Sequence, residues 1–271
     1  MTIEATELRN LRRKETLLAR FVPRYRERVA MESVPLPLRI VLPHCVQSDD
    51  GALLYVKNSK VACTSISQEV YRYSRGEFGD GRVHSIRDGF RQGKESWRSQ
   101  LKTIEDHSAF IFSFVRHPED RFLSAVKDVV IDRTNPNSDS VLKGMRRHGY
   151  RDHQSDEEKL EAALSAVEAT FAIDKIMTEQ HFRSQVDHIG FNHLAFDFIG
   201  RFEALSRDLA LAFAKAGAAE FAAEMAAPAH ANASKKRALK PNAEQRRRIE
   251  ALYQEDFDAF GYDFRSRRTG Q

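Results

Sequence analysis

The sequence predicts an α/β fold in which a central parallel sheet is flanked by helices. Residues 52–56 and 110–115 are apolar, β-favouring runs of strand length, and each is followed by a short loop and a helix-like segment. Units of strand, loop and helix build buried parallel sheets, because the crossover helices cover both faces. A ligand of such a sheet is expected at the carboxyl ends of its strands.

The composition is that of a globular protein. The 271 residues are 41% hydrophobic and 30% charged, which is enough to bury the core of one large domain. The only cysteines are Cys45 and Cys63, so neither a disulfide framework nor a cysteine-based zinc site is predicted. No apolar run reaches the roughly 18 residues of a membrane span, and the first residues lack the apolar region of a signal peptide. We therefore expect a cytoplasmic protein.

Basic residues gather near the two ends of the chain. The net charge is +4, and residues 1–30 carry eight lysines and arginines against four glutamates, with a second basic group at 235–248. Apolar residues at helical spacing predict an amphipathic helix that ends near Pro23, and three prolines between 35 and 43 predict an extended connection. We assign residues 1–45 to a basic helical arm. Peripheral membrane contact and oligomerisation are the roles open to it.

Further elements follow in alternation along the chain. A helix is predicted over 118–131, because Pro118 is a favoured first helical residue and two acidic residues follow it. A polar stretch, 132–159, predicts a loop or a mobile lid. Additional predicted elements are a helix at 157–179, a strand at 196–200, a helix at 203–216 and a last helix from Pro241 to Gly261. Residues 46–265 thus form one domain, followed by a tail at 266–271.

The loop after the first predicted strand has the residues of an anion site. Lys60 follows the apolar run, and hydroxyl residues open the next helix, whose start offers unpaired N–H groups and the positive end of the helix dipole. The second strand ends at Arg116, whose guanidinium can form bidentate bonds to phosphate, and Ser124 in the following helix can complete them. The two strand ends therefore predict a ligand with two anionic groups.

Two other classes of protein fit these residues less well. A magnesium-dependent nucleotide kinase needs the loop G-x-x-x-x-G-K-[ST], but here both glycines are missing and Lys60 stands four residues before Thr64. Arg116 occupies the strand end where such a site needs a carboxylate, so no metal is predicted. A basic module that binds nucleic acid or membrane gives no reason for Lys60, Arg116 and Ser124 to occur together. We do not expect nucleic acid as a partner.

Several motifs resemble those of one enzyme family. Ser59-Lys-Val-Ala-Cys-Thr64 is similar to Pro-Lys-Val-Gly/Ala-Cys-Thr, and residues 114–125 match Phe-Val-Arg-x-Pro-x-x-Arg-x-x-Ser-Ala throughout. His181-Phe-Arg-Ser-Gln185 is similar to His-Trp-x-Pro-Gln, and residues 196–203 are similar to Tyr-Asp-Phe-Ile-Gly-Lys-Tyr-Glu. Residues 53–264 therefore resemble the carbohydrate sulfotransferases of the chondroitin, dermatan and HNK-1 type, which form sulfotransferase family 2.

This resemblance implies a P-loop-like sulfotransferase fold. It also implies transfer of a sulfuryl group from 3′-phosphoadenosine-5′-phosphosulfate (PAPS) to a hydroxyl, which leaves adenosine 3′,5′-bisphosphate. Lys60 is then placed to stabilise charge on the bridging oxygen, while Arg116 and Ser124 hold the 3′-phosphate. A late basic loop adds Lys235 or Lys236 at the same phosphate. The residues implied for the 5′-phosphosulfate are Ser59, Lys60, Val61, Ala62, Cys63, Thr64 and Ser65.

The acceptor hydroxyl loses a proton as it attacks, which requires a general base. His181 is the first candidate because it matches the family's His-x-x-x-Gln element, and His84, between the two cofactor loops, is the rival. The expected acceptor is a glycan, a glycolipid or a small metabolite, and the expected source is bacterial. Residues 132–159 match no motif and are assigned to acceptor binding or to a lid. The sequence leaves the acceptor's identity and the oligomeric state open.

Overall fold

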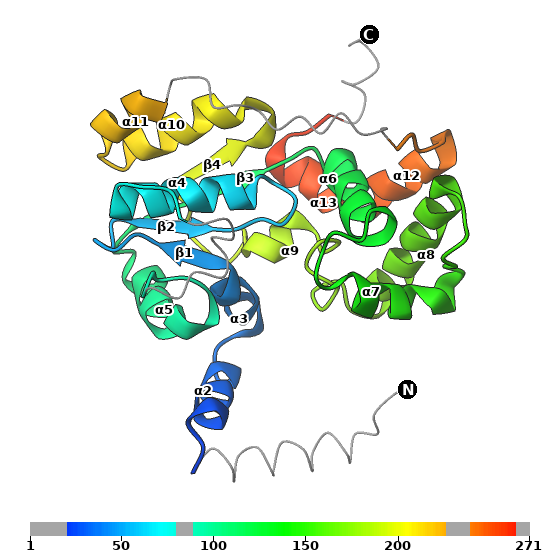
Figure 1. Cartoon of the computed structure of the whole chain (residues 1–271), viewed down its shortest axis with the longest axis horizontal. Coiled ribbons are helices and arrows are strands. Elements are labelled where there is room, and N and C mark those ends of the chain that lie inside the picture. Colours follow the sequence, from blue (N-terminus) through cyan, green and yellow to red (C-terminus); the bar gives the residue numbers. More distant parts are fainter. Residues whose placement is uncertain (1–20, 80–88, 226–238, 264–271) are drawn as a thin grey trace.

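The core of the computed structural model is a four-stranded sheet (Figure 1), and the structure describes residues 21–79, 89–225 and 239–263. The strand order is β1-β2-β3-β4, with β2 parallel to β3 and β3 parallel to β4. The prediction of a central parallel sheet is therefore confirmed. Its edge strand β1, which the sequence analysis did not predict, is antiparallel to β2. The strands are β1 (Cys45–Gln47), β2 (Leu53–Val56), β3 (Phe110–Val115) and β4 (Phe198–Arg201).

Both faces of the sheet are buried, which explains the continuous apolar runs in its central strands. Successive side chains of a strand point to opposite faces. Tyr55 and Phe112 therefore pack on one side of the sheet, whereas Leu54 and Ile111 pack on the other. On the first side lie α4 (Cys63–Arg75), α10 (Leu205–Lys215) and α11 (Ala219–Met225), and on the second lie α3 (Leu36–Val41), α5 (Trp97–Asp106) and α9 (Gln185–Ile189).

A separate helical layer extends from the carboxyl-terminal side of β3, at the right of Figure 1. It has its own apolar core, to which Phe122, Leu142, Leu164 and Ile249 contribute fully buried side chains. The layer consists of α6 (Pro118–Ala125), the π-helix η4 (Val126–Ile131), α7 (Ser138–Met145), the 3₁₀ turn η5 (Arg146–His148), α8 (Asp156–Asp174), α12 (Ala243–Leu252) and α13 (Gln254–Phe260). It brings the segments on either side of His181 close to the ends of the strands.

The predicted extended connection between residues 35 and 43 is wrong. This segment forms α3 and the 3₁₀ turn η1 (Leu42–His44), and α2 (Pro23–Glu32) precedes it. Each of these helices carries its proline in the first turn, where a missing N–H breaks no intrahelical bond. The prolines therefore start helices here. Residues 1–20 and the tail at 266–271 lie outside the described residues.

The polar segment 132–159 is also more regular than predicted. It contains α7, η5 and the start of α8, because Leu142 and Met145 give α7 a buried side at helical spacing. The predicted last helix is divided at Tyr253 into α12 and α13, and Asn242 rather than Pro241 caps its start through a capping box. Gly261 ends it in the left-handed conformation, as predicted.

Gly200 in β4 allows the ring of Phe114 to pack against the strand. A methyl group at this position would lie 2.3 Å from Cε1 of Phe114, closer than real side-chain contacts. We expect Gly200→Ala to lower the free energy of unfolding by about 1–3 kcal/mol, because the buried ring must move. Urea denaturation measures the change. Gly144→Ala in α7 is the control, since nothing lies within 4 Å of its added methyl group, and equal stabilities of the two variants would contradict the prediction.

Candidate functional site

The loop between β2 and α4 folds tightly without glycine. Lys60 and Ala62 both have positive φ, at 68° and 50°. For residues with a side chain this conformation costs roughly 1–2 kcal/mol each, and such strain is concentrated at ligand sites. The α4 helix starts at Cys63, one residue earlier than predicted, and Ala62 before it has no side chain that caps the first amides. Thr64 and Ser65 are exposed in the first turn. The helix start is therefore open to an anion.

Gln185 ties together the ends of β2 and β3. Its Oε1 accepts hydrogen bonds from Nδ2 of Asn58 at 3.0 Å and from the backbone N–H of Arg116 at 2.9 Å. Its Nε2 donates to the Arg116 carbonyl at 2.8 Å. Asp256 in turn accepts the backbone N–H groups of Gln185 and Val186, and burial raises the pKa of Asp256 to about 6. The glutamine of the His181 motif therefore positions the two strand ends.

Arg116 lies directly against the loop between β2 and α4, the predicted anion loop. Its Nη1 donates to the carbonyl of Lys60 at 3.2 Å, and its guanidinium stacks 4.3 Å from the ring centre of Phe202. The half-buried guanidinium is thus held beside the loop that carries Lys60. Ser124 lies half-buried near the end of α6, and its contact with a phosphate stays a prediction.

Arg121, the other arginine of the second motif, is only 2% exposed. Its guanidinium donates to three backbone carbonyls, those of Ser59 at 2.9 Å, Arg183 at 2.7 Å and Gln180 at 3.3 Å. It therefore joins the anion loop to the segment on both sides of His181. This role is structural, and it explains why an arginine stands in the core of the motif.

A continuous line of polar contacts runs from Lys60 to His181. Nζ of Lys60 donates to Oδ2 of Asp128 at 2.9 Å. Nδ2 of Asn135 donates to the same carboxylate oxygen at 3.4 Å and contacts Nε2 of His181 at 3.0 Å. The structure thereby brings together two residues that the sequence analysis predicted to be catalytic, although 121 positions separate 60 from 181 in the chain.

The contacts of His181 define which nitrogen of its ring carries the proton. Both carboxylate oxygens of Glu179 engage the residue, one at 2.8 Å from Nδ1 and the other at 2.9 Å from the backbone N–H. Nδ1 therefore carries the proton and donates it, which leaves Nε2 as the acceptor of the Asn135 amide. Nε2 contacts Asn135, whose amide also contacts Asp128, the partner of Lys60. This is the orientation that a general base at this site requires.

Asp128 is ionised in this arrangement. Partial burial acts to raise its pKa, but hydrogen bonds from Thr134 and Lys60 outweigh this effect and hold the pKa below its ordinary value. The carboxylate therefore balances the charge of Lys60 within the site.

Asp128, Asn135 and Glu179 are not among the residues that the sequence predicts for the site. Asp128 stands next to Lys127 between the apolar residues 125–126 and 129–131 of the predicted 118–131 helix, and this interruption is the one signal it gives. Glu179 stands two residues before His181, within reach of its ring. His84, Lys235 and Lys236 lie outside the described residues, so their roles stay predictions.

His188 is fully buried beside the anion loop. Its Nδ1 accepts from Nη1 of Arg183 at 3.5 Å, and its Nε2 contacts Oγ of Ser59 at 3.3 Å. Its ring centre lies 4.7 Å from that of His44. Burial first, and then the neighbouring positive charges, hold the pKa of His188 well below its ordinary value. It therefore stays neutral in the folded protein.

This neutrality predicts a loss of stability in acid. Below about pH 6.5 the unfolded chain binds a proton at His188 that the folded chain does not bind. The free energy of unfolding therefore decreases as the pH is lowered, by at most about 1.4 kcal/mol per pH unit. Asp256 acts in the opposite direction below about pH 6, because its folded pKa is raised. We expect His188→Gln to lose about 1 kcal/mol less than the wild type between pH 7.5 and 5.5, measured by urea denaturation. Parallel losses in the two proteins would contradict this account of His188.

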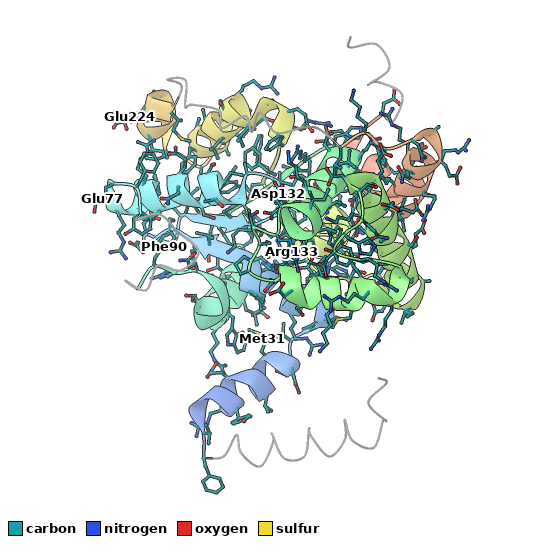
Figure 2. The ribbon with its side chains drawn as sticks, turned by 45° about the vertical axis from the view of Figure 1, so that its right-hand side comes forward. Met31, Glu77, Phe90, Asp132, Arg133 and Glu224 are labelled. Atoms are coloured by element: carbon teal, nitrogen blue, oxygen red, sulfur yellow. The ribbon has the colours of Figure 1, made fainter. Side chains whose placement is uncertain are left out.

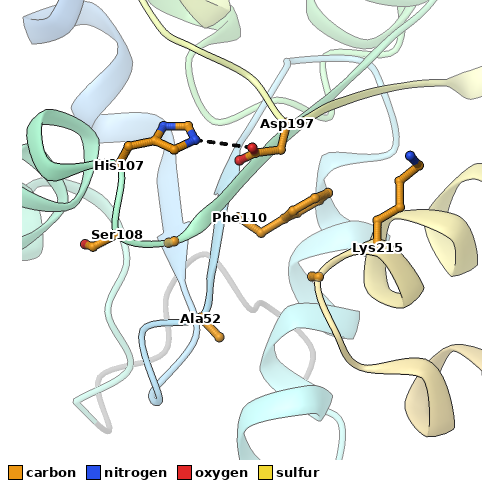
Figure 3. A pocket seen from close by; sticks show the side chains of 8 residues that line it. Ala52, His107, Ser108, Phe110, Asp197 and Lys215 are labelled. Carbon is orange, nitrogen blue, oxygen red and sulfur yellow. Dashed lines mark hydrogen bonds and ion pairs between the residues drawn. The ribbon is translucent and has the colours of Figure 1, made fainter.

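A cavity of about 380 Å³ lies at the amino-terminal end of β3 (Figure 3), away from these residues. His107 and Asp197 line it and bond to each other at 3.2 Å, and Asp197 also accepts the N–H of Ile111 at 2.7 Å. Asp197 thus fixes the start of β4 against β3. None of the predicted site residues that the structure describes lines this cavity.

Two further observations concern the described ranges alone. No group of three or more His, Cys, Asp or Glu side chains there is arranged to hold a metal ion. Within the same ranges, every helix is too short or too polar to cross a bilayer.

A known protein family has a model that spans all the motifs described above. The model of the sulfotransferase family matches residues 43–263, which include both strand-end loops and the His181 segment. No curated protein and no solved structure matches the chain. The mostly parallel sheet with flanking helices is consistent with the P-loop-like fold of that family. Since the match spans most of the 271 residues, the chain belongs to the sulfotransferase family.

Proposed function

We propose that the protein is a carbohydrate O-sulfotransferase that uses PAPS, with Lys60 at the reacting sulfate and His181 as the general base. The observation that carries the proposal is the polar line from Lys60 through Asp128 and Asn135 to Nε2 of His181. It supports a site in which a cation and a base act on one reaction. Membership of the family favours sulfuryl transfer over phosphoryl transfer and over a basic binding module.

The residues present fit a donor with two anionic groups. The uncapped start of α4 and the strained backbone of Lys60 and Ala62 suit the phosphosulfate. Arg116 stands beside that loop and suits a phosphate, which its planar guanidinium binds in bidentate fashion. When bound, PAPS supplies the sulfuryl group, whose bond to the 5′-phosphate breaks as a bond to the acceptor oxygen forms.

Each side chain of the line then has a defined task. Lys60 leaves Asp128 for the anion and neutralises the charge that develops as the S–O bond breaks. Nε2 of His181 takes the proton of the acceptor hydroxyl, and Glu179 keeps Nδ1 protonated and the ring in place. Asn135 holds Nε2 until the acceptor hydroxyl replaces its amide.

Calorimetric titration with adenosine 3′,5′-bisphosphate tests the donor. We expect binding that is at least about tenfold tighter than that of adenosine 5′-monophosphate, because a second phosphate adds charge-assisted hydrogen bonds. Arg116→Ala is expected to remove most of this preference. Equal affinity of the wild type for the two nucleotides would reject PAPS as the donor.

The proposal of a carbohydrate acceptor draws on the resemblance of the motifs to carbohydrate sulfotransferases. Transfer of label from radioactive PAPS to a panel of glycans, glycolipids and small alcohols tests it. We expect label on a sugar hydroxyl. Transfer to non-sugar alcohols alone would leave the sulfotransferase in place and reject the carbohydrate acceptor.

A further inference from the structure

A cavity of about 370 Å³ lies between α7 and α8, beside the segment that carries His181. Its floor is apolar, formed by the buried side chains of Met145, Val167 and Phe182. Its rim is polar and includes Arg147, His148 and Glu179. The volume lies within the range of small-molecule sites, and an apolar floor with a few polar groups is their usual composition.

The cavity adjoins the proposed base. Thr178, Glu179 and Phe182 line it, and they stand on both sides of His181 in the chain. The opposite wall is α7, which begins three residues after Asn135, the contact of Nε2. Asp132 and Arg133, labelled in Figure 2, lead from η4 into this wall. A molecule held along α7 therefore lies against Glu179, which contacts Nδ1 of His181, whereas neither His181 nor Asn135 itself lines the cavity.

Gly144 contributes to the opening of this cavity. It lies inside α7, where glycine is less favourable than alanine by about 1 kcal/mol. Its φ is not positive, and nothing lies within 4 Å of a methyl group built on it, so neither backbone conformation nor close packing requires glycine here. Any larger side chain at this position would extend into the space that the cavity now provides.

The charges at the rim favour an anion. Arg147 and His148 are exposed, and within the described part of the chain Arg147 forms no ion pair. The carboxylate of Glu179 is already engaged by His181. Apolar surface continues beyond the rim, since Ile173 and Met177 are 87% and 61% exposed. Ile173 lies on the same side of α8 as the lining residues Ala166 and Thr170, by the i, i+4, i+7 spacing.

We propose that this cavity binds the acceptor, and that the acceptor carries a compact apolar group next to a carboxylate or similar anion. The proposal rests on the sulfotransferase function above. The apolar group occupies the floor beside Gly144, the anion pairs with Arg147, and the end that carries the hydroxyl extends past Glu179, the lining residue that contacts His181, toward that histidine. The 132–159 segment thereby forms one wall of an acceptor site.

Three probes separate the apolar and the anionic requirement. Phenyl β-D-glucuronide has both groups, phenyl β-D-glucoside lacks the carboxylate, and methyl β-D-glucuronide lacks the ring. Their binding is measured by ligand-observed NMR without nucleotide, so the result does not depend on the donor. We expect the first probe to bind at least about tenfold tighter than methyl β-D-glucuronide, as burial of a phenyl group implies.

Gly144→Phe fills the cavity and is expected to weaken binding of phenyl β-D-glucuronide by at least about tenfold. Lys143→Phe is the matched control, because it adds the same ring to α7 at an exposed position that does not line the cavity. Arg147→Gln is expected to reduce the preference for phenyl β-D-glucuronide over phenyl β-D-glucoside by about fivefold. This is the size of effect expected when an exposed ion pair is lost.

Equal binding of phenyl β-D-glucuronide by the wild type and Gly144→Phe, or no binding by the wild type, would overturn the inference. The titration with adenosine 3′,5′-bisphosphate is run on the same variants. Normal nucleotide binding together with unchanged probe binding in Gly144→Phe rejects the acceptor site alone. Equal affinity of the wild type for adenosine 3′,5′-bisphosphate and adenosine 5′-monophosphate rejects the donor proposal, whatever the probes show.

Discussion

Replacing Lys60 by methionine is expected to lower kcat by about 10²–10³-fold, the usual effect of removing one group that stabilises charge in a transition state. Methionine keeps much of the length and apolar surface of the side chain but removes its charge. Adenosine 3′,5′-bisphosphate lacks the transferred sulfate, so its affinity is expected to change far less than kcat. Single-turnover transfer from labelled PAPS and calorimetry measure the two quantities.

Asp128→Asn is the matched control for this variant. It removes the ion pair with Lys60 but leaves the lysine in the loop. We expect its kcat to stay within about tenfold of the wild type, because Asp128 holds Lys60 only until the anion arrives. Equal losses in the two variants would show that the ion pair, rather than the charge of Lys60 at the sulfate, supports the reaction.

Replacing His181 by glutamine is expected to lower kcat by about 10²–10⁴-fold, the range for loss of a general base. Glutamine retains a hydrogen-bonding side chain of similar reach, so the buried surroundings keep a polar partner. Nucleotide affinity is expected to stay within about twofold of the wild type, because Lys60 and Arg116 are untouched. A variant that keeps the full rate would place the base elsewhere, with His84 as the remaining candidate.

Glu179 provides a second test of the same base. Glu179→Ala removes the acceptor of the Nδ1 proton, so the ring loses its fixed orientation. We expect kcat to fall about 10-fold or more, and Glu179→Gln to restore most of it because the amide oxygen accepts the same hydrogen bond. Failure of glutamine to restore activity, with a normal melting temperature in both variants, would argue against this positioning role.

The central strands of the sheet and the two loops that follow them were predictable because their signals are local, whereas the short edge strand β1 was not. The runs at 53–56 and 110–115 are apolar on both faces of the strand, and Pro118 marks the helix after the second run. The prolines between 35 and 43 predicted an extended segment but start helices, since proline suits both an extended segment and a first helical turn. Tertiary packing decides between these, and for 35–43 it favours helices buried against Trp97 and the sheet.

The candidate site was predictable only in part. Lys60 and Arg116 were predictable because Lys60 lies in the loop after one strand, Arg116 directly follows the next, and parallel strand ends lie at the same edge. Asp128 and Asn135 reach Lys60 and His181 through the fold of η4 and α7, and no spacing in the sequence reveals such contacts. Arg121 and Gln185 stand within recognisable motifs, but only their hydrogen bonds show that they hold the backbone.

The π-helix η4 lies between the ion pair of Lys60 and the contact of Asn135 with His181, since it contains Asp128 and ends at Ile131. Its wide turn, closed by the bond from the N–H of Asp132 to the carbonyl of Lys127, accommodates one residue more than an α-helical turn. Deleting one residue of η4 after Asp128 would shorten the spacing between Asp128, which contacts Lys60, and Asn135, which contacts His181. Residues such as Asn135 would then lose their alignment with His181. The extra residue of η4 therefore sets the chain spacing on which the contacts of Asp128 with Lys60 and of Asn135 with His181 depend.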